Sequence, residues 1–336
     1  MGVSTAAAPT TPGRASTWAD RWLRPLGWAT LVANVVLVCT GGAVRLTGSG
    51  LGCPTWPRCN GSSFTPHHAL NVHSAIEFGN RTLTFVLVVI AIATVVATVR
   101  SSRRDLRGLS VLLALAIPLQ AVIGGISVLT DLNPWVVSFH LLCSMAIIGV
   151  AVLFLWRLGQ PTSGEGVPSG AVTGLAWATF ASAWVVLYVG TVVTGSGPHA
   201  GDATAPRNGL DPLQLSQLHA DVVFLFVGLT LGLLFTLHAT RASAGAVRAV
   251  RVLLAVELLQ GAIGFVQYFS DLPIVLVGFH MLGAAMISAV VTWTVLECRV
   301  AHEPRSTAED AAAGRRPAPA SAAPLPGPGL ARPARR

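Results

Sequence analysis

Long apolar runs alternate with short polar connections along this chain. Eight of the runs reach about 20 residues, the length at which an α-helix crosses the hydrocarbon core of a membrane. Backbone polar groups in a membrane must be satisfied within their own segment, so we expect each run to be a helix. The predicted spans are residues 25–46, 72–99, 108–130, 134–157, 171–194, 213–239, 247–269 and 273–297.

The composition supports this interpretation. Of 336 residues, 52% are hydrophobic and 11% are charged, whereas soluble domains carry roughly a quarter charged residues. The net charge is +8, and every basic residue is arginine. These arginines lie in short segments between apolar runs, which is typical of topology determinants and not of a nucleic-acid surface. We therefore predict a multi-pass protein of the cell membrane, in contact with lipid and not with nucleic acid.

The arginines also predict an orientation. They gather before the first span, after the second, fourth and sixth spans, and after the last. Cytoplasmic connections carry an excess of arginine, so both termini are predicted to be cytoplasmic. Residues 1–24 and 302–336 are rich in Ala and Pro and are expected to be disordered tails. We expect no cleavable signal peptide.

The chain contains an internal repeat. The sequence TGSG occurs at 47–50 and again at 194–197. The stretch QAVIGGISVLTDLNPWVVSFHLL from Gln120 matches QGAIGFVQYFSDLPIVLVGFHML from Gln260. Four helices in each repeat give both halves the same orientation, which is a parallel repeat. We predict an all-α integral membrane fold of eight transmembrane helices, arranged as two parallel-repeat four-helix bundles over 25–158 and 171–298.

The repeat places histidines at related positions. His219 and His280 lie at similar depth in the sixth and eighth spans, about 10 Å below the outer surface. Two imidazoles at one depth on facing helices suit the axial positions of a haem iron. Two hydrogen-bonded core histidines are the alternative. In the first half His140 corresponds to His280, but Asn80 stands where His219 would have its counterpart.

The second span opens with HSAIEFGNRTLTF, an unusual concentration of polar groups for a membrane segment. Such groups are costly in a membrane and are usually functional. His73, Glu77 and Asn80 project from one helix face. The first half therefore has His140 and a nearby carboxylate, which suits chemistry, whereas two imidazoles suit electron transfer. A structural ion pair between Glu77 and Arg81 is the alternative.

The motifs GGAVRLTGSGLGCPTWPRC and IEFGNR, together with the paired histidines, resemble haem A synthases of the Cox15/CtaA family. The resemblance covers about residues 25–298. It implies an oxidoreductase that converts the C8 methyl group of haem O to a formyl group by successive hydroxylations. The product, haem A, serves cytochrome oxidase, so the resemblance also implies a place in the cytochrome oxidase assembly pathway. The sequence leaves open whether the chain docks with haem O synthase or forms a homo-oligomer.

The resemblance also implies roles for particular residues. The second half would hold haem b through His219 and His280, and the first half would hold the substrate haem. The family usually has Glu-x-x-His-Arg where this chain has Asn80. Either His73 supplies the missing imidazole, which we favour, or His140 binds the iron alone. Residues implied at the substrate haem are His140, Asn80, Arg81 and Arg45. Glu77 would be catalytic, carrying a proton or stabilising a cationic intermediate at the C8 carbon.

Two features of the first outer loop have alternatives. Cys53 and Cys59 flank PTWPR on the oxidising side of the membrane. A disulfide is predicted there, and the family subtype with two cysteines in this loop supports it; two free thiols are the alternative. Arg45 beside the first TGSG could bind a haem propionate or anchor the helix at the membrane interface.

Two groups near the inner side are expected to be structural. Glu257 in the seventh span would pair with Arg251 or with a loop group. His238 would lie at the inner membrane interface.

Two other functions are open from the sequence. A bis-His electron-transfer cytochrome linked to quinol shares the argument from His219 and His280, but it gives Glu77 no role. A membrane transporter needs no haem.

Overall fold

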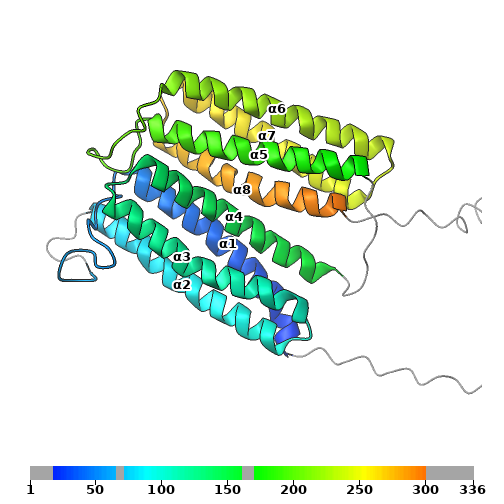
Figure 1. Ribbon diagram of the computed structural model, residues 1–336, viewed down its shortest axis with the longest axis horizontal. Helices are drawn as coiled ribbons and strands as arrows, with labels where there is room; N and C mark the ends of the chain where they lie inside the picture. The colour runs from blue at the N-terminus through cyan, green and yellow to red at the C-terminus, as the bar shows by residue number, and fades with distance from the viewer. Residues whose placement is uncertain (1–17, 66–71, 161–169, 300–336) are drawn as a thin grey trace, which may run out of the picture. The chain divides into compact units, whose positions relative to one another are not determined.

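The computed structural model describes residues 18–65, 72–160 and 170–299 (Figure 1). Eight α-helices form this part of the chain, and each is long and apolar enough to cross a membrane. The predicted all-α fold with eight membrane-spanning helices is therefore confirmed. The helices are α1 (Trp18–Leu46), α2 (Val72–Arg100), α3 (Arg107–Leu129), α4 (Pro134–Gly159), α5 (Gly170–Ser196), α6 (Pro212–Ala239), α7 (Ala244–Phe269) and α8 (Ile274–Arg299), and a short 3₁₀ helix, η1 (Arg104–Leu106), precedes α3.

Local sequence signals set several helix starts. The side chains of Asn133 and Asp211 cap α4 and α6, and a proline follows each cap at the first helical position. The side chain of Ser243 caps α7. A cap side chain satisfies one of the unpaired N–H groups of the first turn, and proline there has no N–H to lose.

The start of α1 corrects one prediction. Residues 1–24 were expected to form a tail, but α1 begins at Trp18 and continues through Pro25. Leu23 is fully buried in a core cluster, and Asp20 accepts hydrogen bonds from the connection between α2 and α3. These contacts outweigh the tendency of proline to break a helix. The other residues of the predicted tails, 1–17 and 302–336, lie outside the described residues.

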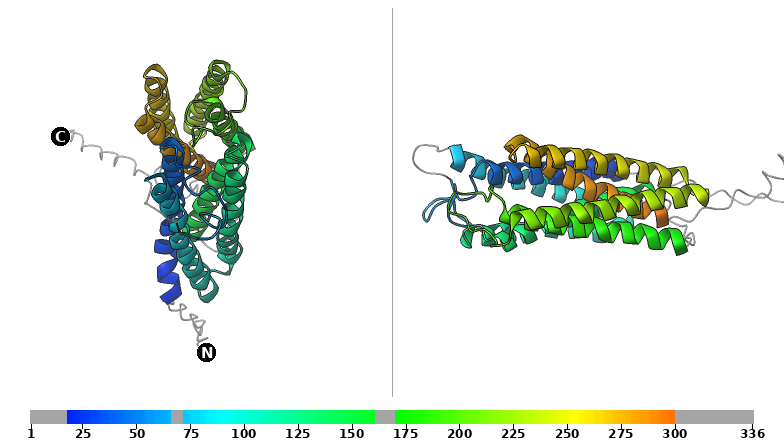
Figure 2. Two further views of the ribbon diagram at one scale, coloured as in Figure 1. Left: turned by 90° about the vertical axis from the view of Figure 1, so that its left-hand side faces the viewer. Right: turned by 90° about the horizontal axis from the view of Figure 1, so that it is seen from above.

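The helices pack as two closed rings. In each half every helix contacts the next, and the first contacts the fourth: α1 with α4, and α5 with α8 (Figures 1 and 2). The halves meet where α8 contacts α1 and α4, and where α4 contacts α5. The described residues all belong to one compact unit. The boundaries 25–158 and 171–298, and the descent of both rings from one repeated bundle, stay predictions.

The interface between the halves depends on small side chains. The hydroxyl of Ser288 on α8 donates to the carbonyl of Met145 on α4 at 2.7 Å. One turn further along, Gly149 faces Thr292, and an added Cβ would lie only 3.0 Å from Oγ1 of Thr292. Small residues let helix backbones approach closely in a membrane.

One end of the helices carries the two long connections, 47–65 and 197–211, and we call it the long-loop end. Each TGSG copy contacts the other half of the chain there. The amide of Gly50 donates to the carbonyl of Gly201 at 2.8 Å, and Arg45 donates through Nη2 to the carbonyl of Thr194 at 2.9 Å. The prediction that this end faces outward is not tested by these contacts.

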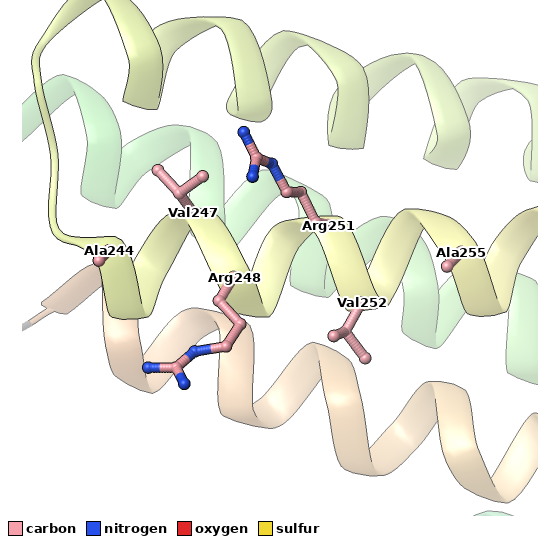
Figure 3. Close-up of a pocket in the computed structure, with 6 residues that line it drawn as sticks. All are labelled: Ala244, Val247, Arg248, Arg251, Val252 and Ala255. Atoms are coloured by element: carbon pink, nitrogen blue, oxygen red, sulfur yellow. The ribbon is translucent and has the colours of Figure 1, made fainter.

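Helix α7 begins at the end of the molecule away from the long-loop end, and its first turns line a hollow (Figure 3). Arg251 in this hollow contacts the imidazole of His238 at 3.1 Å. Glu257 instead accepts a hydrogen bond from Thr230 at 2.7 Å, so its predicted pairing with Arg251 is wrong. Six residues separate Arg251 from Glu257, which turns the two side chains to different faces of the helix. The residues that line the hollow are Ala244, Val247, Arg248, Arg251, Val252 and Ala255.

Candidate functional site

The imidazoles of His219 and His280 face each other inside the second ring. Among the described helices α6 contacts α5 and α7, so α8 lies across the ring from it. The ring centroids are 6.4 Å apart, and the ring planes are inclined by 71°. An imidazole nitrogen lies about 2 Å from a metal that it binds. Two such bonds, plus the distance from each ring centre to its nitrogen, span roughly 6 Å, so the spacing fits two axial ligands of one metal.

Three imidazoles have an unpaired ring nitrogen. The Nδ1 atoms of His140, His219 and His280 are buried and make no hydrogen bond to the described residues, although the carbonyl of Val186 lies near His219. Buried polar atoms in folded proteins are nearly always satisfied. Histidines with this deficit fit residues that hold a further group.

A haem is the group that suits these histidines. Over residues 18–65, 72–160 and 170–299, no three His, Cys, Asp or Glu side chains gather into a site for a metal ion. A haem iron needs only one or two protein ligands, because the porphyrin supplies the other four. The arrangement therefore fits a haem better than a bare metal ion.

Each of these imidazoles packs against a glycine of a neighbouring helix, which we call its glycine seat. A Cβ atom built on Gly124 would lie 3.2 Å from Cε1 of His140. The same distance is 3.1 Å from Gly190 to His219 and 3.4 Å from Gly264 to His280. Any larger residue at Gly124 or Gly190 would push the imidazole, so glycine fixes where the ring lies.

Two glutamines bind the backbone of the histidines on α4 and α8, the fourth helix of each ring. Gln120 donates through Nε2 to the carbonyl of His140 at 3.2 Å, and Gln260 donates to the carbonyl of His280 at 2.9 Å. The glutamines and the glycines four residues after them occupy matching places in the repeat. Sequence reasoning missed these residues, although the repeated Gln-x-x-x-Gly pattern accompanied the histidines.

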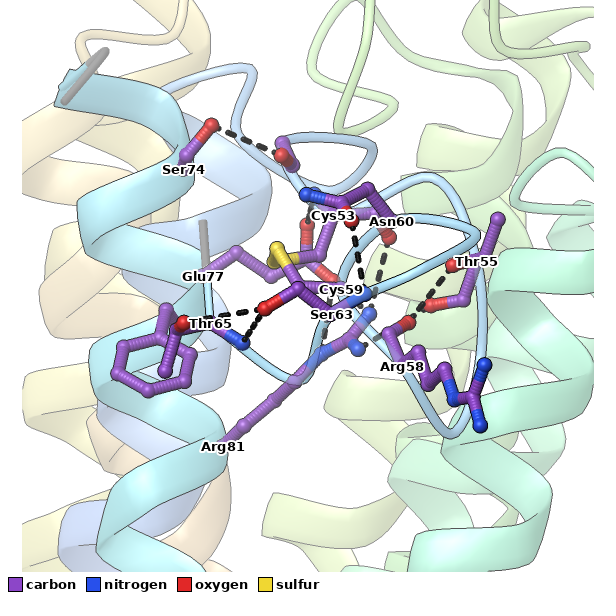
Figure 4. The surroundings of a disulfide bond; sticks show 12 residues. Cys53, Thr55, Arg58, Cys59, Asn60, Ser63, Thr65, Ser74, Glu77 and Arg81 are labelled. Carbon is purple, nitrogen blue, oxygen red and sulfur yellow. Dashed lines mark hydrogen bonds and ion pairs between the residues drawn. A yellow bond between two sulfur atoms is a disulfide. The ribbon is translucent and has the colours of Figure 1, made fainter. Parts of the chain in front are cut away.

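Glu77 lies on α2 in an ion pair with Arg81 (Figure 4). Only 5% of Glu77 is exposed. Its Oε1 accepts from Nε of Arg81 at 3.1 Å, and its Oε2 accepts from the amide of Cys53. Arg81 also donates to the carbonyls of Cys53 and Thr55, at 3.0 and 3.2 Å. The ion pair is therefore present and ties the loop to α2. A catalytic role for Glu77 stays a prediction.

The loop is closed by the predicted disulfide between Cys53 and Cys59, which is confirmed. Both cysteines are buried. Between them Trp56 packs against Gly125 on α3, where a Cβ atom would collide with the indole. The loop therefore bridges α2 and α3. Free cysteines in the described residues are Cys39, Cys143 and Cys298.

The structure separates His73 from the other imidazoles. His73 is the second residue of α2, and its Nδ1 lies 2.9 Å from the hydroxyl of Ser49 at the long-loop end. The backbone N–H and hydroxyl of Thr204 lower the pKa of the Asp202 carboxyl, and the imidazole of His73 lowers it further. His73 therefore faces the loops, so the geometry does not favour His73 as a replacement iron ligand.

Asn80 lies deeper in α2 and is held by a neighbour. Its Oδ1 accepts a hydrogen bond from the hydroxyl of Thr40 on α1 at 2.7 Å. Thr40 was not singled out from the sequence, because nothing in the pattern of α1 marks it.

Arg45 lies at a small cavity of the long-loop end that His199, Asp202 and Arg207 also line. Its Nε is buried and makes no hydrogen bond to the described residues. A carboxylate would satisfy that donor, so the place fits a propionate, while the bond to Thr194 also fits an anchor. The ring Nε2 of His199 contacts the carbonyl of Leu272 at 3.0 Å.

Comparison with known proteins gives consistent matches. A family model described as cytochrome oxidase assembly protein, COX15-CtaA, matches residues 24–209. A haem A synthase of Staphylococcus epidermidis is 22% identical over 297 residues, which cover 81% of this chain and 95% of that protein. One of Bacillus licheniformis is 30% identical over 142 residues, covering 41% of this chain and 45% of that protein. One of Lysinibacillus sphaericus is 28% identical over 186 residues, covering 52% of this chain and 58% of that protein.

Proposed function

Since the chain belongs to the COX15-CtaA family of cytochrome oxidase assembly proteins, we propose that it is a haem A synthase. It is an oxidoreductase that converts the C8 methyl group of haem O to a formyl group and so provides haem A for cytochrome oxidase. The observation that carries the proposal is the pair of facing imidazoles, His219 and His280, at 6.4 Å.

In the second ring His219 and His280 would hold haem b. When bound, this haem supplies one-electron redox chemistry. The polypeptide fixes the two ring positions through the glycine seats, and an apolar core cluster lies further along the same four helices. Rigid placement of both ligands suits a site that exchanges electrons without binding other molecules.

In the first ring the substrate haem O lies beside His140, Asn80 and the Glu77–Arg81 pair. His140 binds the iron, and Arg45 pairs with a propionate through the donor at Nε. Glu77 stabilises positive charge that develops at the C8 carbon, or accepts a proton at a carboxylate oxygen. Arg81 holds that carboxylate in place and keeps the loop closed over it.

Haem analysis tests the function. The chain is expressed with haem O synthase, purified, and its haems are extracted and identified by mass. We expect haem b together with haem A, and we expect membranes of cells that express haem O synthase without this chain to contain haem O and no haem A. Haem b alone, with haem O supplied, would contradict the proposal and favour a bis-His electron-transfer cytochrome. A preparation without haem from haem-replete cells would favour a transporter.

Docking with haem O synthase and homo-oligomer formation also stay predictions for this chain. Both are accessible in the same preparations, by co-purification of the two enzymes and by the mass of the complex in detergent.

A further inference from the structure

The two rings differ at one position that could hold an iron ligand. In the second ring both imidazoles have a glycine seat, Gly190 for His219 and Gly264 for His280. In the first ring His140 has its seat at Gly124. The fourth position holds Asn80.

The first ring also lacks the seat that an imidazole at position 80 would need. The TGSG copies begin at 47 and 194, an offset of 194 − 47 = 147, so Gly190 corresponds to residue 43. Residue 43 is alanine. At Gly190 an added Cβ would lie 3.1 Å from the His219 ring, and by the repeat Ala43 carries a methyl group at the corresponding position.

Asn80 is itself a poor ligand for iron. Its Oδ1 is engaged by the hydroxyl of Thr40 at 2.7 Å. A neutral amide is also a hard, weakly basic donor, whereas haem iron in proteins takes imidazole, thiolate, thioether or phenolate ligands. The side chain is shorter than histidine, so the position is recessed from the centre of the ring.

His73 does not fill the position. It lies seven residues before Asn80, about 10 Å nearer the long-loop end at 1.5 Å per residue. Ser49 contacts its Nδ1, and Asp202 of the second long connection lies close enough to be affected by its charge. Moving this imidazole to the depth of His140 would require α2 to shift by about two turns.

We propose that the first ring binds its haem through the imidazole of His140 alone and leaves the Asn80 side of the macrocycle open to a small exogenous ligand, of the class of carbon monoxide, cyanide or azide. The inference rests on the proposed function, because it needs a haem in the first ring. It distinguishes the two haems by coordination: the second-ring iron has two protein ligands, and the first-ring iron has one.

Ligand binding by the full-length chain tests the inference. The protein, loaded by co-expression with haem O synthase, is reduced and exposed to carbon monoxide, and the ferric form is analysed by electron paramagnetic resonance. We expect carbon monoxide to bind one of the two haems and the ferric protein to show one low-spin and one high-spin centre.

A double variant, Ala43→Gly with Asn80→His, copies the Gly190–His219 pair into the first ring. We expect it to lose carbon monoxide binding and to gain a second low-spin centre. Ala43→Gly alone is the matched control that adds no imidazole, and it should bind carbon monoxide as the parent does. His73→Ala should also bind it unchanged.

The possible failures are separable. A parent protein with two low-spin haems and no carbon monoxide binding would overturn this inference and leave the proposed function intact. Gain of carbon monoxide binding in His73→Ala would identify His73 as the ligand and also overturn it. A chain that retains only the second-ring haem, even with haem O added after purification, would overturn both proposals.

Discussion

At the scale of single residues, a missing side chain is as informative as a present one. Gly124, Gly190 and Gly264 make no polar contact with the imidazoles, yet each lies within 3.4 Å of a ring once a Cβ is added. Close-packed interiors respond to a single methyl group. The glycine on the neighbouring helix therefore helps to set the position of each imidazole.

Gly190→Ala should weaken haem b binding. Overpacking costs about 1–3 kcal/mol, so the haem b content of the purified chain should fall severalfold and the low-spin spectrum should change. The control is Gly174→Ala on the same helix, where an added Cβ meets nothing within 4 Å. Equal haem b content in the two variants would contradict the seat argument.

Glu77→Gln should reduce conversion of haem O to haem A by about a hundredfold or more, the usual scale of a lost acid–base or charge-stabilising group. The amide can still accept a hydrogen bond from Cys53, but it has no charge to offer. The control is Glu257→Gln, a buried carboxylate on α7 that is bound by Thr230. Conversion at the parent rate, with haem b content unchanged, would leave Glu77 with a structural role only.

At the scale of elements, the loop 47–65 joins α2 to α3 through its contacts. The Glu77–Arg81 pair fixes Cys53 on α2, and Trp56 covers Gly125 on α3. The disulfide shortens the loop between these two attachments. Reduction should therefore loosen both attachments together.

Labelling with a membrane-impermeant thiol reagent on intact cells measures the state of Cys53 and Cys59. The chain is first freed of its helical cysteines by Cys39→Ser, Cys143→Ser and Cys298→Ser. We expect modification only after treatment with a reductant, because both sulfurs are bonded in the folded chain. Labelling without reductant would show free thiols. A further variant without Cys53 and Cys59 gives the background.

The elements were predictable to different degrees. The eight spans follow from apolar length alone, because the membrane sets that length. The early start of α1 was not predictable, since it depends on Asp20 meeting the α2–α3 connection. Facing imidazoles at His219 and His280 followed from the repeat. The seats at Gly124 and Gly190 did not, because a glycine shows its role only once the opposite side chain is placed.

At the scale of the whole molecule, the arginine distribution predicts that the long-loop end faces outward and both termini are cytoplasmic. In a cysteine-free chain, Thr204→Cys should react with an impermeant reagent on intact cells. Arg241→Cys, at the opposite end, should react only after the membrane is permeabilised. Both side chains are exposed, so burial does not hide either one. The reverse pattern would invert the topology.

Helix α8 contacts α1, α4, α5 and α7, so it touches both rings, and it is the last of the helices that the structure describes. During synthesis α8 is made after the seven other described α-helices. Until then α1 and α4 keep an uncovered face, even though their own ring is complete in sequence. The contact surface between the two halves is therefore complete only once α8 has been added.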